Sequence, residues 1–426
     1  MKKIIPFLVA CFVSLISYSQ NIDKIINAKE VARIQSVLAS DDMQGRATFT
    51  PSIDKAADFI ANEFKKSGLK YFGELKSYKQ PFSMLKATLI SASGNINGHS
   101  LEPDNIIAIT TNEALKFDEN SGYTTVVIDS SANFFKEAFA LLNDDKKYFV
   151  LVNNFHAKNF SRLKYFNRES FETKAPVVFA LTDENPSTYN FEIKNKITPS
   201  SLANVVGVLP GKTKKDEYVI FSAHYDHLGI GKPDAKGDSI YNGANDDAAG
   251  TTAVIMLANY FSKLNKNERT LIFVTFTAEE IGGFGSQYFS KQIGPEKAVA
   301  MFNIEMIGTD SKWGNNSAYI TGYEKSDFGK ILQSNLEGSN FNFEPDPYPE
   351  QNLFYRSDNA TLAALGVPAH TISTSKMDNE PNYHKQSDEI STLDMKNMAG
   401  IIKAIAISSG TIVSGKDTPM RVEKRN

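Results

Sequence analysis

The second half of the chain alternates between apolar runs and helical segments. Taken in order, these runs and segments cover residues 217–225, 249–264, 270–278, 285–294, 298–308, 328–338 and 366–374. The apolar runs lack the polar alternation of a half-exposed strand, which indicates strands that are buried on both faces. Such strands, separated by helices, are typical of a mainly parallel or mixed sheet flanked by helices. The predicted fold class is therefore α/β.

The residues before this alternation form two regions of different character. Residues 21–74 show helical periodicity, with Ala56, Ile60 and Phe64 on one face of a helix. Residues 75–200 contain short β-rich runs, such as "YTTVVID" and "YFVLVNN", separated by polar or helical connections. We predict a smaller β-rich domain inserted over 75–200, the alternative being a long excursion from a single core.

The two ends of the chain also carry distinct patterns. Two lysines, an apolar stretch and small residues in "MKKIIPFLVACFVSLISYSQ" predict a secretory signal over 1–20, and hence a periplasmic or secreted protein. A lipoprotein signal ending at Cys11 is the alternative. Cys11 is the only cysteine, so the mature protein would have no disulfide and would depend on its core and on any bound metal for stability. The polar tail, 414–426, is expected to be frayed.

Composition argues against two classes of partner. The net charge is −3, without a broad basic field, so nucleic acid is not expected to bind. No later run of about 18 apolar residues occurs, so no membrane span is expected. With 426 residues, of which 41% are hydrophobic, the chain can bury one large core and a second smaller one.

Acidic or imidazole side chains stand where each central apolar run ends. Four such groups occur in order along the chain: His224 with Asp226, Asp246 with Asp247, Glu279 with Glu280, and Glu305. Each group alone has a structural explanation, as a helix cap or a hydrogen-bonded histidine. Because the carboxyl ends of parallel strands meet at one edge of a sheet, the four groups are expected to converge there. Their carboxylates would repel one another unless a cation neutralised them.

The residue types indicate which cation this site would bind. One or two imidazoles with three or four carboxylates suit zinc, because calcium and magnesium sites rarely use histidine. A carboxylate shared between two ions would let five protein ligands hold a pair with open positions for water and substrate. Asp226 lies two residues beyond His224 and is better placed to accept the other imidazole N–H than to bind metal itself.

Five motifs in order resemble those of one known family. They are "HYDHLG", "NGANDDAAG", "TAEEIGGFGS", "NIEMIG" and "YRSDN" followed by "NYHKQSDE". The series is similar to that of the di-zinc aminopeptidases of peptidase family M28, which include bacterial leucyl aminopeptidases and glutamate carboxypeptidases. The resemblance covers residues 200–410, and "SDDMQGRATFTPSIDKAADFIANEFKKSGL" resembles the family's leading segment. It implies a zinc-peptidase-like catalytic domain over 201–413, with 21–74 as its N-terminal helical part.

The resemblance also implies a role for each motif residue. It implies five ligands for two zinc ions: His224 and Glu305 for one, Glu280 and His384 for the other, and Asp246 shared between them. Glu305 stands where relatives often have aspartate. Glu279 matches the general base, and this agrees with the need for a non-ligand carboxylate beside a ligand carboxylate. Tyr383 matches a tyrosine that donates to the oxyanion in some relatives, and Asp226 keeps the family's position behind the first histidine.

Three other residues and one region are left outside this ligand set. His227 is interpreted as a loop residue. Arg356 is interpreted either as a contact for a substrate carboxylate or as part of a structural salt bridge. Asn359 stands where many relatives have histidine, which leaves the substrate-facing role of that loop open. The region 75–200 occupies the place where some relatives carry a protease-associated domain.

The leading hypothesis is an exported zinc metallopeptidase, and specifically an aminopeptidase that hydrolyses N-terminal residues from peptides. The alternatives on the same fold are a glutaminyl cyclase-like acyltransferase, a carboxypeptidase and a non-catalytic binding domain. Cyclase-like relatives favour tryptophan beside the last histidine ligand, where this chain has Tyr383, and its only tryptophan is Trp313. All five ligand positions and the base position are filled, which argues against a non-catalytic domain. A carboxypeptidase would need a cation for the terminal carboxylate, and Arg356 is the only candidate nearby in sequence.

Overall fold

The computed structural model describes residues 22–173 and 175–425, so the predicted signal segment lies outside the described residues. The described residues form two compact units, one within 22–81 and 203–425 and the other within 82–202. The chain passes from one unit to the other within strand β1 (Lys79–Ile96) and again within strand β8 (Tyr189–Leu209). Among the described residues, no helix is both long enough and apolar enough to cross a bilayer.

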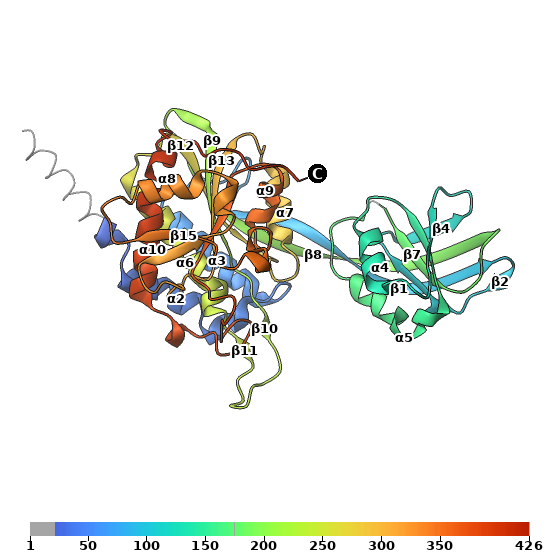
Figure 1. Ribbon diagram of the computed structural model, residues 1–426. Helices are drawn as coiled ribbons and strands as arrows, with labels where there is room; N and C mark the ends of the chain where they lie inside the picture. The colour runs from blue at the N-terminus through green and yellow to red at the C-terminus, as the bar shows by residue number, and fades with distance from the viewer. Residues whose placement is uncertain (1–21, 174, 426) are drawn as a thin grey trace, which may run out of the picture. The chain divides into compact units, whose positions relative to one another are not determined.

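The larger unit is built around a mixed sheet with the strand order β15-β14-β16-β13-β9-β12-β8 (Figure 1). Its other strands are β9 (Lys214–His224), β12 (Arg269–Phe276), β13 (Ala298–Ile304), β14 (Ser317–Ile320), β15 (Asn342–Pro345) and β16 (Ala369–Ser373). The four central strands β16, β13, β9 and β12 are mutually parallel, whereas β8 and β14 join them antiparallel. The predicted α/β class with a mainly parallel or mixed sheet is therefore confirmed.

Successive residues of a strand point to opposite faces of the sheet. Both faces of this sheet therefore carry apolar side chains, and helices cover both. Val219 and Phe221 of β9 pack in one apolar core, whereas Ile220 between them packs in a second core on the other side. The first core is covered by α2 (Ala28–Leu38), α3 (Pro51–Lys66), α6 (Ala249–Leu264), α8 (Phe328–Ser334) and α10 (Met395–Ser408). The second is covered by α7 (Phe284–Gln292) and α9 (Asn359–Ala364). The strands are thus buried on both faces, as their unbroken apolar runs indicate.

Local signals fix where the helices of the first face begin. Asn27 accepts a hydrogen bond from the backbone N–H of Glu30 and so caps α2. Pro51 starts α3, where the missing N–H of proline costs nothing. Asp394 accepts from the N–H groups of the first turn of α10.

The smaller unit has its own sheet, of strand order β3-β7-β6-β5. Its strands and helices are β3 (Ile106–Ile109), β5 (Thr124–Ile128), α4 (Phe134–Leu142), β6 (Tyr148–Val152), α5 (Ala157–Phe160) and β7 (Val177–Leu181). One face packs on α4, through Phe134 and Val150. The other packs on the paired strands β4 (Ala114–Asp118) and β8, through Phe149 and Phe191. A short hairpin links the end of β1 to β2 (His99–Ser100).

The polar tail is not frayed, and that prediction is wrong. Val422 is buried in the second core of the larger unit, and Arg421 donates hydrogen bonds to the carbonyls of Pro295 and Ala298. The backbone N–H of Arg425 donates to the carbonyl of Ala364 in α9. One buried apolar residue and hydrogen bonds to three carbonyls anchor the tail, and such contacts leave no periodic pattern in a polar sequence.

A buried arginine ties the N-terminal part of the chain to the loops at the end of β9. Arg46, fully buried, follows α2 at the end of η1 (Asp41–Arg46). Its guanidinium donates hydrogen bonds to four backbone carbonyls, of Leu38 at 2.6 Å, Tyr225 at 2.8 Å, Asn242 at 2.6 Å and Gly243 at 3.0 Å. One side chain therefore satisfies carbonyls from three segments that are distant in sequence.

We expect Arg46→Met to lower the free energy of unfolding of the larger unit by at least about 3 kcal/mol, because several buried carbonyls would lose their donor. Urea unfolding followed by the fluorescence of Trp313, the only tryptophan, reports on this unit alone. Arg33→Met is the matched control, because Arg33 is 44% exposed and its partner Glu63 keeps Lys66. Equal losses in the two variants would contradict the anchoring role of Arg46.

Candidate metal centre

The predicted site residues come together at the carboxyl edge of the parallel strands. His224 is the last residue of β9, Glu279 and Glu280 follow β12, and Glu305 follows β13. Asp246 lies in the short helical segment η5 (Ala244–Ala248), which leads into α6. Since β9, β12 and β13 are parallel neighbours, their ends deliver these side chains to one place.

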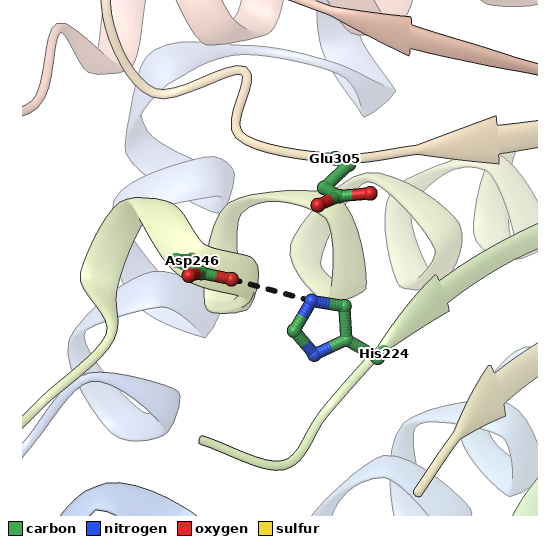
Figure 2. Close-up of side chains that lie close together, drawn as sticks. All are labelled: His224, Asp246 and Glu305. Atoms are coloured by element: carbon green, nitrogen blue, oxygen red, sulfur yellow. Dashed lines mark ion pairs between the residues drawn. The ribbon is translucent and has the colours of Figure 1, made fainter. Parts of the chain in front are cut away.

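His224, Asp246 and Glu305 form the first group, with ligand atoms that all lie within 4.8 Å of one another (Figure 2). His224 donates from Nδ1 to the backbone carbonyl of Asp226 at 3.1 Å, so its Nε2 carries a lone pair. That Nε2 is buried, lies 3.2 Å from Asp246 Oδ1 and makes no hydrogen bond. A buried lone pair that faces a carboxylate oxygen fits a shared cation between the two atoms.

His227, Asp246 and Glu280 form a second group, with ligand atoms that all lie within 4.8 Å of one another, and His384 lies beside it. His384 lies in the loop after β16, and its Nε2 is 3.2 Å from Asp246 Oδ2 and 3.1 Å from Glu280 Oε2. Within the group, His227 Nδ1 lies 2.7 Å from Glu280 Oε1. The two carboxylate oxygens of Asp246 thus face two different imidazoles, as a bridging ligand requires.

The spacing and chemistry of these donors fit divalent transition-metal ions. Zinc bonds to nitrogen and oxygen of about 2.0–2.2 Å in a tetrahedron place neighbouring ligand atoms about 3.3–3.6 Å apart. The separations of 3.1–3.2 Å between the imidazoles of His224 and His384 and the oxygens of Asp246 and Glu280 are close to this range. Imidazole and carboxylate together suit zinc better than calcium or magnesium.

Asp226 has a different partner from the one predicted. Its carboxylate oxygen Oδ1 lies 3.8 Å from His224 Nδ1, and the backbone carbonyl of Asp226 accepts that N–H instead. The carboxylate accepts the backbone N–H groups of Glu279 at 3.1 Å and Glu280 at 3.3 Å. The imidazole N–H is directed at the backbone carbonyl, and the side chain accepts only the two backbone N–H groups. Asp226 therefore orients His224 through its backbone and the Glu279–Glu280 segment through its side chain.

Two further buried acids hold the backbone of the site: Asp388, which the sequence analysis does not single out, and Asp247, which it places at this edge without a role of its own. Asp388 accepts the N–H groups of Asn245 at 2.8 Å and Asp246 at 3.0 Å. Asp247, joined to Asp246 by a cis peptide bond, accepts the N–H of Met306 at 3.0 Å. Only the position of Asp388 in "QSDE", four residues after a ligand candidate, could have drawn attention to it.

Glu279 and Tyr383 line the same pocket as the candidate ligands, without belonging to either group of three. Burial raises the pKa of Glu279 well above its ordinary value, and the charges of Glu305 and Asp358 add to the rise. A raised carboxyl pKa suits a group that must accept and return a proton. Burial and the neighbouring carboxylates also raise the pKa of Tyr383, so its phenol stays a neutral hydrogen-bond donor.

Arg356 and Asn359, the remaining predicted candidates, lie outside both candidate ligand groups. Arg356 lines the pocket, is exposed and donates to Gln351 Oε1 at 3.3 Å, and among the described residues no carboxylate forms an ion pair with it. Asn359 is fully buried and donates to the carbonyls of Phe354 and Ala369, so its role is structural. The other walls of the pocket include Tyr319, Leu353 and Met377.

Residues 204–408 match the family model described as Peptidase family M28. Among curated proteins, Aminopeptidase YwaD of Bacillus subtilis is 21% identical over 263 residues, covering 58% of this chain and 52% of that protein. Mouse Aminopeptidase NAALADL1 is 27% identical over 128 residues, covering 28% of this chain and 16% of that protein. The chain therefore spans about half or less of the length of these relatives.

Solved structures share the fold over nearly the whole chain. An aminopeptidase from Aneurinibacillus sp. strain AM-1 has a TM-score of 0.54 at 17% identity, covering 95% of this chain and 99% of that one. The zinc aminopeptidase BSAP from Bacillus subtilis also has a TM-score of 0.54 at 17% identity, covering 91% and 95%. At this level of identity the likeness shows the fold alone.

We expect a chelator to lower the thermal midpoint of the larger unit, and added zinc to restore it, because the clustered carboxylates repel one another without a cation. Zinc at about 1,000 times its dissociation constant adds about 4 kcal/mol, or about 5–15 °C for a unit of this size. Scanning calorimetry measures the shift. The double variant His224→Ala, His384→Ala is the control and should not respond; an equal response would place the metal elsewhere.

Proposed function

We propose that this chain, whose residues 204–408 belong to peptidase family M28, is a zinc aminopeptidase that removes N-terminal residues from peptides. The observation that carries the proposal is the arrangement around Asp246. Its two oxygens face the imidazoles of His224 and His384, and the non-ligand carboxylate of Glu279 lines the same pocket. We propose two zinc ions, held by His224, Glu305, Glu280 and His384, with Asp246 shared.

Bound zinc would supply a Lewis acid for the scissile carbonyl and would lower the pKa of the attacking water. Glu279 then accepts the proton of that water and returns it to the leaving amine, which is the work of a general base and acid in turn. The backbone of Glu279 is fixed by Asp226, so the carboxylate is presented from a rigid position. Tyr383 donates its phenol proton in a hydrogen bond to the oxygen of the former carbonyl.

The charges of the pocket support cleavage at the N-terminus. Glu279, Glu280 and Glu305 line it together, so a free α-ammonium is favoured over a terminal carboxylate. Arg356 is the one arginine, and there is no lysine, among the described residues that line the pocket; it is exposed, and it donates to Gln351 Oε1 at 3.3 Å. A carboxypeptidase would need a buried, positioned cation for the terminal carboxylate, and an exposed arginine does not supply one.

The other two alternatives find less support at the site. A cyclase-like acyltransferase would favour tryptophan beside the last histidine, where Tyr383 stacks on His384 with ring centroids 3.9 Å apart. A non-catalytic binding domain has no need of a non-ligand carboxylate with a raised pKa beside two imidazole–carboxylate groups.

We also propose that the protein is exported through the segment 1–20, and that the smaller unit, Phe82–Leu202, is an insertion into the catalytic unit. The apolar stretch and small residues at the N-terminus support the export, as they do for other secretory signals. The separate sheet and cores of the smaller unit support the insertion.

Glu279→Gln is expected to keep the fold and the bound zinc but to lose about 10²–10⁴-fold in kcat, because glutamine has the same size and cannot accept a proton. Steady-state kinetics on aminoacyl p-nitroanilides, with zinc content measured on the same samples, checks this. Near-normal turnover would place the base elsewhere, and loss of zinc would make Glu279 a ligand.

N-acetylation of a peptide substrate is expected to lower kcat/KM at least tenfold, or about 1.4 kcal/mol of transition-state binding, because it removes the α-ammonium charge. Free and N-acetylated forms of the same dipeptide are compared under identical conditions. Efficient cleavage of the acetylated form, together with a large loss on Arg356→Ala, would favour a carboxypeptidase instead.

A further inference from the structure

His227 is a loop residue, but it lies inside the site. It follows the end of β9 by three positions, and only 2% of its surface is exposed. Its Nδ1 lies 2.7 Å from Glu280 Oε1 and 3.9 Å from Asp246 Oδ2. An imidazole in this place has two alternative roles: it binds a metal ion itself, or it donates a hydrogen bond to a carboxylate that binds one.

Interatomic distances separate the two roles. Two ligand atoms of one tetrahedral zinc ion lie about 3.3–3.6 Å apart, whereas an N–H···O hydrogen bond to a carboxylate measures about 2.7–2.9 Å. His384 Nε2 is 3.1 Å from Glu280 Oε2 and 3.2 Å from Asp246 Oδ2, longer than the second range for both oxygens and slightly short of the first. His227 Nδ1 is 2.7 Å from Glu280 Oε1, within the second. The two oxygens of Glu280 are thus divided between a ligand position and a hydrogen bond.

The surroundings of His227 keep its ring in this orientation. Its backbone N–H donates to the carbonyl of Arg46 at 3.3 Å. Gly243, at φ +57°, lies against the ring so closely that a Cβ atom there would come within 2.5 Å of it. The Nε2 of His227 is buried and has no hydrogen-bond partner, so Nδ1 provides the ring's hydrogen bond.

We propose that His227 is a positioning residue, whose Nδ1–H holds Glu280 Oε1 and so directs Oε2 toward the second metal ion. This inference rests on the proposed function. Loss of such a partner typically weakens metal binding about 10–100-fold. His227 lies in the second candidate group, with Asp246 and Glu280, and not in the group of His224, Asp246 and Glu305, so the effect should be confined to the second ion.

The test is a zinc titration of the full-length apo-protein in competition with a chromophoric chelator, which reports two binding constants without using activity. His227→Ala should weaken the second binding constant about 10–100-fold and leave the first within about twofold. His227→Asn should recover most of that loss, because the asparagine amide nitrogen takes the place of Nδ1. His99→Ala, at an exposed histidine of the smaller unit, is the control and should change neither constant.

Each result decides the inference. If His227→Ala binds both ions as wild type does, the positioning role is wrong. If His227→Asn and His384→Asn each abolish binding of the second zinc ion, His227 is a direct ligand, and the positioning role is again wrong. Wild-type protein that binds no zinc would instead overturn the proposed function, and the inference with it. Circular dichroism on each variant excludes misfolding, and the asparagine variant still decides the matter if the alanine variant does not fold.

Discussion

Three buried carboxylates outside the proposed ligand set hold the backbone of the residues inside the candidate metal centre. Asp226 accepts the N–H groups of Glu279 and Glu280, Asp388 accepts that of Asp246, and Asp247 accepts that of Met306, next to Glu305. Backbone amides carry no net charge, so they stabilise these acids without adding a competing cation. Asp246, Glu280 and Glu305 are left to the imidazoles and to the proposed metal ions, and Glu279 to its proposed role as base. The acids at this edge of the sheet therefore divide into a supporting set, the coordinating set that we propose, and Glu279.

The coordinating set depends on segments that are remote in sequence, and Arg46 connects them. Its guanidinium bonds to the carbonyls of Tyr225 and Gly243, on either side of the loop between the first histidine and Asp246. Its own carbonyl accepts the N–H of His227. Gln35 adds a hydrogen bond to the carbonyl of Ala244 at 2.6 Å. The N-terminal helices thus support the site directly, beyond covering the sheet.

The sequence allowed the sheet and the convergence of the acids to be predicted, because strand ends depend on local apolar patterning. The side-chain partner of Asp226 was predicted wrongly, because spacing along a strand does not reveal how the chain turns after His224. The burial of His227 depends on Arg46 and Gly243, and the packing of Val422 on a core formed by other segments. These contacts join residues that are far apart in sequence, so no local sequence pattern predicts them. The division at Pro81 and Leu202 falls within strands, where composition does not change.

Arg46 bonds to residues far along the chain, so its contacts form late in synthesis. Its partner Asn242 lies 196 residues further along, so a ribosome adding about 5–20 residues per second needs about 10–40 s to supply it. For most of that interval Leu38 is the only one of its four carbonyl partners that has been synthesised, and the central strands on which the preceding helix packs have not been made. The strands that carry the site, β9, β12 and β13, also follow the smaller unit in the chain. The smaller unit, with its own cores, is therefore complete in the nascent chain before the catalytic unit can close.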